Sequence, residues 1–299
     1  MNFPREAAQP APAPFVWAGL RLDRPGIMGV LNVTPDSFSD GGRHGGHHGP
    51  DNAVAAGLAM RDDGADIVDV GGESTRPGAA PLSPEDEQAR IVPVIRALAA
   101  AGVLVSVDTR HAATMAAALD AGATIVNDVS ALTHDPDAAA LVAARGCPVV
   151  LMHMRGSPAT MYAEAVYGDV VAEVAAELAD RVAAAAAAGI ARAAMAIDPG
   201  FGFAKRPEHS LALLRGLSRL RRMGLPILAG VSRKGFIGAA GGEADPARRF
   251  PGSMAAGLFA VGQGAAILRV HDVRETVQAL RVWDTLSRVT GSRGRPHGV

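Results

Sequence analysis

Polar side chains recur at one kind of position in this sequence, directly after a short run of apolar residues. Carboxylates and amides can bind the polar edge of a heterocycle, whereas arginine, lysine and histidine can bind an anion and stabilise charge on a leaving group. The polar residues that follow the eight runs are, in chain order, Asn32, Glu73 to Arg76, Asp108 to Arg110, Asn127 and Asp128, His153 to Arg155, Asp198, Ser232 to Lys234, and Arg269 with His271.

The apolar runs have the length and composition of buried β-strands, and segments with helical spacing separate them. Strands that alternate with helices indicate right-handed βαβ units and a parallel sheet. The count of eight favours a closed (β/α)₈ TIM barrel, of class α/β, over a doubly wound open sheet. The expected strands are residues 27–33, 67–70, 103–107, 124–129, 149–154, 194–197, 226–231 and 265–270, and the expected helices are 51–63, 84–100, 112–121, 136–145, 169–188, 208–223, 246–262 and 273–286.

The chain is long enough for one barrel with extensions. We expect a single domain over residues 21–290, with a flexible N-terminal tail over 1–20 and a flexible C-terminal tail over 291–299. Because active sites of such barrels lie at the carboxyl ends of the strands, all eight polar groups would meet on one rim. A single polar residue there is most simply a helix cap, but eight on one rim indicate a binding site, with cations that favour an anionic ligand.

Bulk composition limits the classes of partner. The net charge of −1 argues against a nucleic-acid or membrane-surface binder, both of which need a basic face. The sequence contains no apolar segment of about 20 residues, and its first residues lack the pattern of a signal peptide. The only cysteine, Cys147, cannot form an internal disulfide and is interpreted as a buried structural thiol. We therefore expect a cytoplasmic protein that binds small molecules.

Five longer motifs resemble the signatures of dihydropteroate synthases, in the order in which that family carries them. The resemblance covers roughly residues 26–280, and five motifs in order are far more specific than one short pattern. The motifs are MGVLNVTPDSFSDGG (residues 28–42), GGESTRPG (71–78), DPGFGF (198–203), SRK (232–234) and RVHD (269–272).

The resemblance implies a transferase of folate biosynthesis that condenses 6-hydroxymethyl-7,8-dihydropterin pyrophosphate with p-aminobenzoate, giving 7,8-dihydropteroate and pyrophosphate. Family chemistry implies a dissociative substitution, in which the C–O bond breaks before the aniline nitrogen attacks. No enzyme nucleophile is then needed. The residues that the resemblance assigns to the pterin are Asp108, Asn127, Met152, Asp198 and Lys234.

The same resemblance assigns the remaining site residues. Arg269 and His271 would meet the pyrophosphate, and Asn32 would supply one oxygen ligand to Mg²⁺, which retains phosphate and water ligands. Phe203, Ser232 and Lys234 would line the aminobenzoate pocket. Loops after the first two strands would close over the substrates and exclude water. Those loops carry Phe38, Asp40, Thr75, Arg76 and Pro77, and Lys234, Arg76 and Asp40 are the expected catalytic residues.

Two features depart from the family pattern or stand outside it. The strand-six motif commonly continues Gly-Phe-Gly-Phe-Gly-Lys, but here Ala204 stands before Lys205, which can alter the loop beside Phe203. The first loop also contains His44, His47 and His48. A second metal site there is conceivable, although a glycine-spaced loop tip is the simpler interpretation. His153 is expected to be structural.

Three rival functions remain open. Lys234 could be the Schiff-base lysine of an aldolase-type barrel. A corrinoid-linked pterin methyltransferase shares the barrel and the Asp and Asn contacts, but should lack the SRK and STRPG elements, which are present here. A non-catalytic pterin-binding paralogue should have lost Asn32, Arg76, Lys234 or Arg269, and none of the four is lost. The resemblance also implies a homodimer and a target of sulfonamides, which mimic p-aminobenzoate.

Overall fold

Eight parallel strands form the centre of the molecule, which is a computed structural model whose described residues are 15–34, 50–73, 82–157 and 160–289. The strand order is β8-β7-β6-β5-β4-β3-β10-β9, and a parallel bridge between Ile197 and Ile227 joins the two edges. This closure confirms the predicted barrel. The strands are β3 (Gly26–Asn32), β4 (Ile67–Gly71), β5 (Val105–Asp108), β6 (Ile125–Asp128), β7 (Val149–Met152), β8 (Met195–Asp198), β9 (Leu228–Ala229) and β10 (Ile267–Val270).

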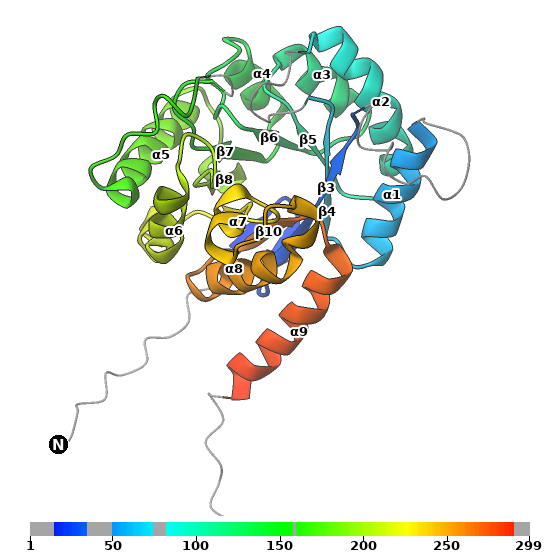
Figure 1. Cartoon of the computed structure of the whole chain (residues 1–299). Helices are drawn as coiled ribbons and strands as arrows, with labels where there is room; N and C mark the ends of the chain where they lie inside the picture. The colour runs from blue at the N-terminus through cyan, green and yellow to red at the C-terminus, as the bar shows by residue number, and fades with distance from the viewer. Residues whose placement is uncertain (1–14, 35–49, 74–81, 158–159, 290–299) are drawn as a thin grey trace, which may run out of the picture.

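Helices surround the strands, and α9 extends away from the barrel (Figure 1). The predicted helix over 208–223 is instead an α-helix and a separate 3₁₀ segment, divided at Gly216, and α7 was not expected. None of the helices in the described ranges is both long and apolar enough to cross a bilayer. The helices are α1 (Pro50–Asp62), α2 (Pro84–Ala100), α3 (Ala112–Asp120), α4 (Ala138–Arg145), α5 (Val170–Ala187), α6 (Pro207–Arg215), α7 (Gly235–Gly241), α8 (Phe250–Gly262) and α9 (Val273–Val289), with 3₁₀ segments η1 (Arg192–Ala194), η2 (Leu217–Met223) and η3 (Pro246–Arg248).

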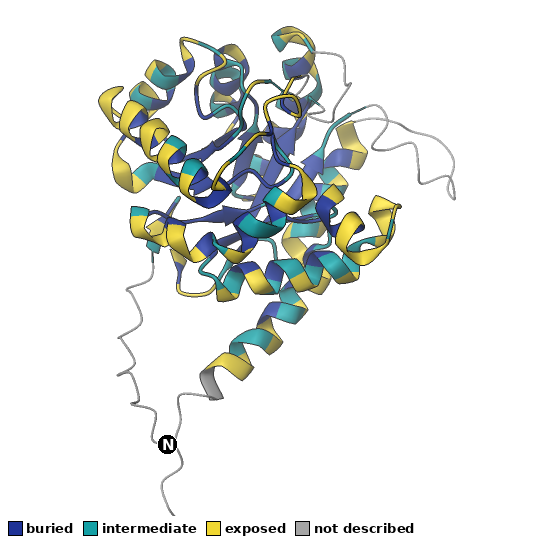
Figure 2. Cartoon of the chain, turned by 60° about the vertical axis from the view of Figure 1, so that its left-hand side comes forward, coloured by how far each residue is buried: buried dark blue, intermediate teal, exposed yellow. Residues whose placement is uncertain are grey.

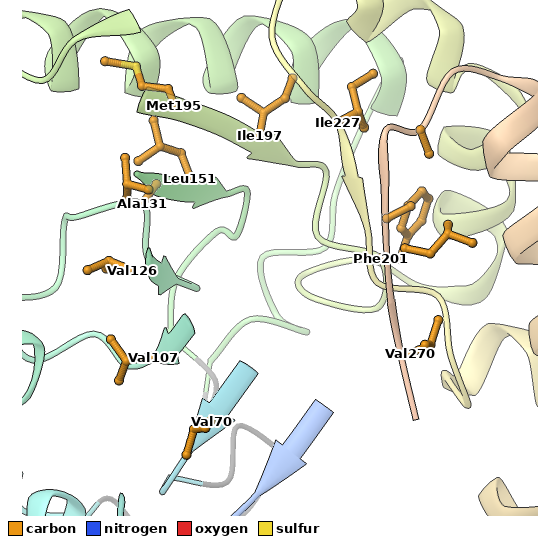
Figure 3. Close-up of a cluster of buried hydrophobic side chains, with 14 of the residues drawn as sticks. Val70, Val107, Val126, Ala131, Leu151, Met195, Ile197, Phe201, Ile227 and Val270 are labelled. Atoms are coloured by element: carbon orange, nitrogen blue, oxygen red, sulfur yellow. The ribbon is translucent and has the colours of Figure 1, made fainter. Parts of the chain in front are cut away.

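Most of the hydrophobic core lies between the strands and the helices. Val107, Val126 and Leu151 come from three successive strands and are fully buried, and Figure 3 shows them in one cluster. The helices bury the faces they turn to the strands and expose the opposite faces (Figure 2). This shell of valine, leucine, isoleucine and alanine supplies the main hydrophobic driving force for folding.

A smaller apolar cluster fills the amino-terminal end of the barrel. It combines inward-facing strand residues with a hairpin of β1 (Phe15–Trp17) and β2 (Leu20–Leu22). Trp17 is 1% exposed, and its indole Nε1 donates to the carbonyl of Ala194 over 2.9 Å. The cluster members are Trp17, Leu22, Met28, Ile67, Ile125, Val150, Ala196, Leu228 and Ile267.

The hairpin corrects the domain boundary predicted at residue 21. Residues 15–20 are not a tail, because they belong to the paired hairpin that buries Trp17 in the lower apolar cluster. Ala18 and Gly19 have φ of 52° and 76°, which are the left-handed values of a two-residue hairpin turn. The rest of the predicted N-terminal tail, and the predicted C-terminal tail, lie outside the described residues.

Inward-facing residues change from apolar to polar along several of the strands. Side chains of a strand alternate between its faces, so two residues after each member of the lower apolar cluster another side chain points into the barrel. Ile67 is thus followed by Asp69, Ile125 by Asn127, and Ile267 by Arg269. The barrel interior therefore has an apolar floor and a polar layer above it, towards the carboxyl ends of the strands.

Candidate active site

Four side chains from four strands form a hydrogen-bonded cluster in this polar layer. Arg269 Nε donates to Asp69 Oδ2 over 2.7 Å, and its Nη2 donates to Asp108 Oδ2 over 2.7 Å. Asn127 Nδ2 donates to the same Asp69 oxygen over 2.9 Å. Two carboxylates share one guanidinium, so their charge is only partly neutralised. Burial outweighs the attraction of Arg269 and raises the pKa of Asp108 to about 7.

Asp198 is at the end of β8 and is 7% exposed. Its Oδ1 accepts a hydrogen bond of 2.7 Å from the backbone N–H of Gly200, which fixes the carboxylate at the start of the following loop. Burial raises its pKa, against the opposing effects of that hydrogen bond and of Lys234. A side chain at Gly230 would approach Asp198 Oδ2 to 3.6 Å, so the glycine keeps space beside the carboxylate.

Lys234 faces the ring of Phe203 across the mouth. Its Nζ lies 4.1 Å from the ring centroid, a cation–π contact between the β9–α7 turn and the β8–α6 loop. Burial and the positive charge of Arg269 lower the pKa of Lys234 to about 8, although Asp198 and Asp108 oppose the shift. The pair presents an aromatic face and a cation to the same space.

The Ser-Arg-Lys turn is held in a strained form. Arg233 has a φ of 58°, unusual for a residue with a side chain, and its backbone N–H donates to Ser253 Oγ of α8 over 2.8 Å. Its guanidinium forms an ion pair with Asp272. These contacts engage the backbone and guanidinium of Arg233 with Ser253 and Asp272. Its neighbours Ser232 and Lys234 instead contact His271 and Phe203 at the mouth.

Ser232 Oγ lies 3.0 Å from His271 Nδ1, and both side chains are at the rim. Burial, together with the positive charges of Arg233 and Arg269, lowers the pKa of His271 to about 4. At neutral pH this imidazole is uncharged and acts as a hydrogen-bonding group. The fixed positive charges near it come from Arg233 and Arg269.

Asn32 ends β3 at the same level as the polar cluster. In the sheet register it is opposite Gly71, which is opposite Asp108. Its half-buried amide is a hard oxygen donor of the type that Mg²⁺ accepts. Within the described ranges no group of three or more His, Cys, Asp or Glu could hold a metal. One amide oxygen of this kind can serve as a single ligand of a Mg²⁺ ion whose other ligands are phosphate and water.

The predicted residues that fall within the described ranges gather at this mouth. Met152, which is 4% exposed, is opposite Asp198 in the register of β7 and β8. Phe38, Asp40, Thr75, Arg76 and Pro77, and the histidines of residues 44–48, lie outside the described residues. The structure brings together Asn32, Asp108, Asn127, Met152, Asp198, Phe203, Ser232, Lys234, Arg269 and His271.

Sequence reasoning missed Asp69, which binds both Arg269 and Asn127. It lies inside an apolar run, but its position two residues after the inward-facing Ile67 could have identified it. The expectation that His153 is structural is consistent with its burial against Lys205 and Glu177. Cys147 is buried, as expected, and burial raises the pKa of its thiol.

Comparison with known proteins identifies the class of this site. The family described as pterin binding enzyme matches residues 28–271. A dihydropteroate synthase of Neisseria meningitidis serogroup B is 47% identical over 282 residues, which cover 92% of this chain and 98% of that protein.

Two solved structures agree. Xanthomonas albilineans dihydropteroate synthase with 4-aminobenzoic acid has a TM-score of 0.85 and 48% identity, covering 92% of this chain and 98% of that one. The same organism's enzyme in complex with 7,8-dihydropteroate has a TM-score of 0.81 and 46% identity, covering 90% and 95%. The chain therefore belongs to the dihydropteroate synthase family of pterin-binding enzymes.

Proposed function

We propose that the barrel mouth joins 6-hydroxymethyl-7,8-dihydropterin pyrophosphate to p-aminobenzoate by a dissociative substitution. The observation that carries the proposal is the polar cluster: buried carboxylates and an amide at its base, and cations with one aromatic ring above it. This composition suits a heterocycle with a polar edge, an anionic leaving group and an aryl amine, which are the three parts that the reaction brings together.

The base of the site suits the pterin. Asp198 can accept two N–H bonds from the amino-pyrimidine edge, and the amide of Asn127 can donate and accept. Lys234 can donate to the carbonyl and N5 side. Asp108 is fixed by Arg269, so its carboxylate is oriented before substrate binds. Orientation of this kind reduces the entropy cost of reaching the reactive geometry.

Bond cleavage needs stabilisation of a departing anion. The C–O bond breaks with both electrons on the pyrophosphate, and the methylene cation is stabilised by the electron-rich pterin. Arg269 and His271 are the rim residues proposed to bind the leaving group, the first by charge and the second as a neutral donor. Mg²⁺ held by Asn32 would supply further neutralisation of that charge.

Bond formation needs the aryl amine on the open side of the cation. The amine nitrogen attacks the methylene carbon and loses a proton, giving dihydropteroate. Phe203 is proposed to pack on the aryl ring, with Ser232 and Lys234 beside it. Phe38, Asp40, Thr75, Arg76 and Pro77 would complete this pocket. A sulfonamide has the same aryl amine and should compete for the same place.

Oxygen exchange separates a dissociative path from direct displacement. The pterin pyrophosphate is labelled with ¹⁸O at the oxygen that joins the methylene carbon to phosphorus. It is then incubated with enzyme and Mg²⁺ without p-aminobenzoate. A dissociative path predicts that the label moves to non-bridging positions of recovered substrate. Dihydropteroate formation by an enzyme that produces no such exchange would contradict it. Asp198→Asn should lose both exchange and product.

A homodimer through α8 and α9 is also proposed. An apolar groove between these helices is lined by Phe250, Met254 and Trp283, and Val282 and Leu286 beside it are 56% and 63% exposed. Light scattering on Val282→Asp should give a monomer if this face is the interface. Val166→Asp, at a valine that is 71% exposed elsewhere, is the control. A dimer that survives Val282→Asp and Leu286→Asp would exclude this face.

A cytoplasmic location is proposed as well. Its support is the single buried thiol of Cys147, which suits a reducing compartment. Fractionation of cells that express the full chain is the direct test, and recovery outside the cytoplasm would contradict the proposal.

A further inference from the structure

The sequence contains only two lysines, Lys205 and Lys234, and both lie in loops near the barrel mouth. Lys234 faces the mouth. Lys205 belongs to the loop between β8 and α6 (residues 199–206), and its side chain is buried beneath that loop, 2% exposed. Its Nζ donates to the carbonyl oxygens of Phe203, over 2.9 Å, and His153, over 3.3 Å. It also lies 2.8 Å from His153 Nδ1. Burial lowers the pKa of this amino group to about 7, because an ammonium is costly to bury. In either protonation state the amino group can donate to these acceptors.

The contact with His153 belongs to a longer chain of hydrogen bonds. His153 Nε2 lies 2.9 Å from Glu177 Oε2. The carboxylate can only accept, so Nε2 carries the proton and Nδ1 is left as the acceptor for Lys205. Burial and the positive charge of Lys205 lower the pKa of His153 to about 4, which agrees with a neutral ring. Arg155 pairs with Glu177 at the outer end of the chain.

His153 also holds the other end of the same loop. Its backbone N–H donates to the Asp198 carbonyl over 2.9 Å. A Cβ at Gly200 would lie 2.1 Å from the His153 carbonyl oxygen, so the loop passes against this residue with no room for a side chain. At the start of the loop His153 is hydrogen-bonded to Asp198 and packs closely against Gly200. At its end His153 accepts a hydrogen bond from Lys205.

The network also braces a strained position. Ala204 has a φ of 48°, in the region that favours glycine. Its carbonyl accepts a hydrogen bond of 3.0 Å from the hydroxyl of Tyr167, whose ring lies 4.0 Å from the Arg155 guanidinium. The carbonyls of Phe203 and Ala204 are thus both held from behind, by Lys205 and Tyr167 respectively.

We propose that Lys205 is a positioning residue for the aminobenzoate half of the site, acting through His153 and the loop backbone to hold the ring of Phe203 against Lys234. The proposal rests on the proposed function, which gives Phe203 and Lys234 to the aryl substrate. Lys205 touches neither substrate. It fixes the backbone from which Phe203 projects, on the face of the loop opposite the mouth.

Kinetics with two substrates give the first test. Lys205→Met removes the amino group that donates to the two carbonyls and keeps roughly the length of the side chain. We expect the KM for p-aminobenzoate to rise by about tenfold, the scale of a small misplacement of a binding group, while the Kd of the pterin pyrophosphate changes by less than about twofold. Tyr167→Phe should change KM in the same direction by a smaller factor, because only the Ala204 carbonyl loses its donor. Glu208→Gln, at an exposed position of α6, is the control.

A purely structural role would lower kcat and weaken both substrates together, and that result would overturn the proposal. Unchanged KM in both variants would also overturn it. If the wild type formed no dihydropteroate, the proposed function itself would fail. If the wild type is active and the variants keep its KM, only the role of Lys205 fails.

Nuclear magnetic resonance of the wild type is a test that does not depend on the folding of a variant. Protein labelled with ¹³C at lysine Cε should give two lysine signals, and Lys234→Ala assigns them. Titration with dihydropteroate should shift the Lys234 signal directly and the Lys205 signal through Phe203. A Lys205 signal that stays fixed while that of Lys234 moves would contradict the proposed coupling.

Discussion

The guanidinium of Arg269 donates to the fully buried carboxylate of Asp69 over 2.7 Å, and this pair joins β10 to β4 inside the barrel. Arg269 was expected to bind pyrophosphate, and two of its nitrogens are already committed to Asp69 and Asp108. The arginine therefore orients the carboxylates of Asp69 and Asp108, of which Asp108 is proposed to bind the pterin, as well as presenting positive charge to the rim.

A double-mutant cycle tests the Asp69–Arg269 pair. Arg269→Met should lower the free energy of unfolding by about 3–5 kcal/mol, because a buried carboxylate is left without its partner. Asp69→Asn in addition should recover part of that loss. Urea denaturation measures each variant, with Arg274→Met on the exposed face of α9 as the control. Strictly additive losses would show that the two side chains are not coupled.

Removal of Trp17 from the apolar cluster at the amino-terminal end should lower the free energy of unfolding and leave kcat unchanged. Trp17→Ala should cost about 3–5 kcal/mol of unfolding free energy, because it empties the floor of the barrel. The site lies at the opposite end of the strands, so kcat of the folded fraction should change by less than about twofold. Val16→Ala, at a side chain that is 70% exposed, is the matched control. Loss of kcat at full folding would contradict the assignment.

The lowered pKa of Lys234 predicts an alkaline limb in the activity. The lysine is proposed to bind substrate as the ammonium, which predominates below its pKa of about 8. The pH profile of kcat/KM for the pterin pyrophosphate reports the free enzyme and should fall above pH 8. Lys234→Arg, if it retains activity, should move the limb upwards. A profile that stays flat to pH 10 would show that the charge of Lys234 is not required.

Stability should depend on pH through Lys205. Burial lowers its pKa from 10.5 to about 7, so between these values the unfolded chain binds more protons than the folded chain. The free energy of unfolding of the wild type relative to Lys205→Met should then rise with pH across this window, by at most about 1.4 kcal/mol per pH unit. Urea titrations at pH 7 and pH 9 measure the difference. A difference that falls with pH would contradict the lowered pKa of Lys205.

Much of this architecture could be predicted from sequence, and the failures have physical causes. The continuous apolar run that becomes β7 is buried on both faces, as a central parallel strand requires. Helix α2 begins where Ser83 caps it and Pro84 starts it. The β1–β2 hairpin has three-residue strands and an Ala-Gly turn, too little for period-two alternation to be visible.

The positions of candidate site residues at the strand ends could be predicted from the sequence. The contacts of Asp69, inside a strand, and of Lys205, in a loop, could not. Asp108, Asn127 and Asp198 stand where strands end, so their exposure to the mouth follows from topology. Asp69 is hidden in a strand interior, and the role of Lys205 depends on how a loop folds back onto His153. Contacts between side chains from distant segments are decided by tertiary packing, which local sequence patterns do not encode.

Pyrophosphate release is the most direct test of the central claim. The pterin pyrophosphate and Mg²⁺ are supplied with and without p-aminobenzoate, to the wild type and to Lys234→Ala, and both pyrophosphate and dihydropteroate are measured. We predict release that depends on Mg²⁺, dihydropteroate whenever p-aminobenzoate is present, and loss of at least about a hundredfold in the variant. Pterin binding by the wild type without any dihydropteroate would contradict the account and indicate a pterin-binding protein without synthase activity.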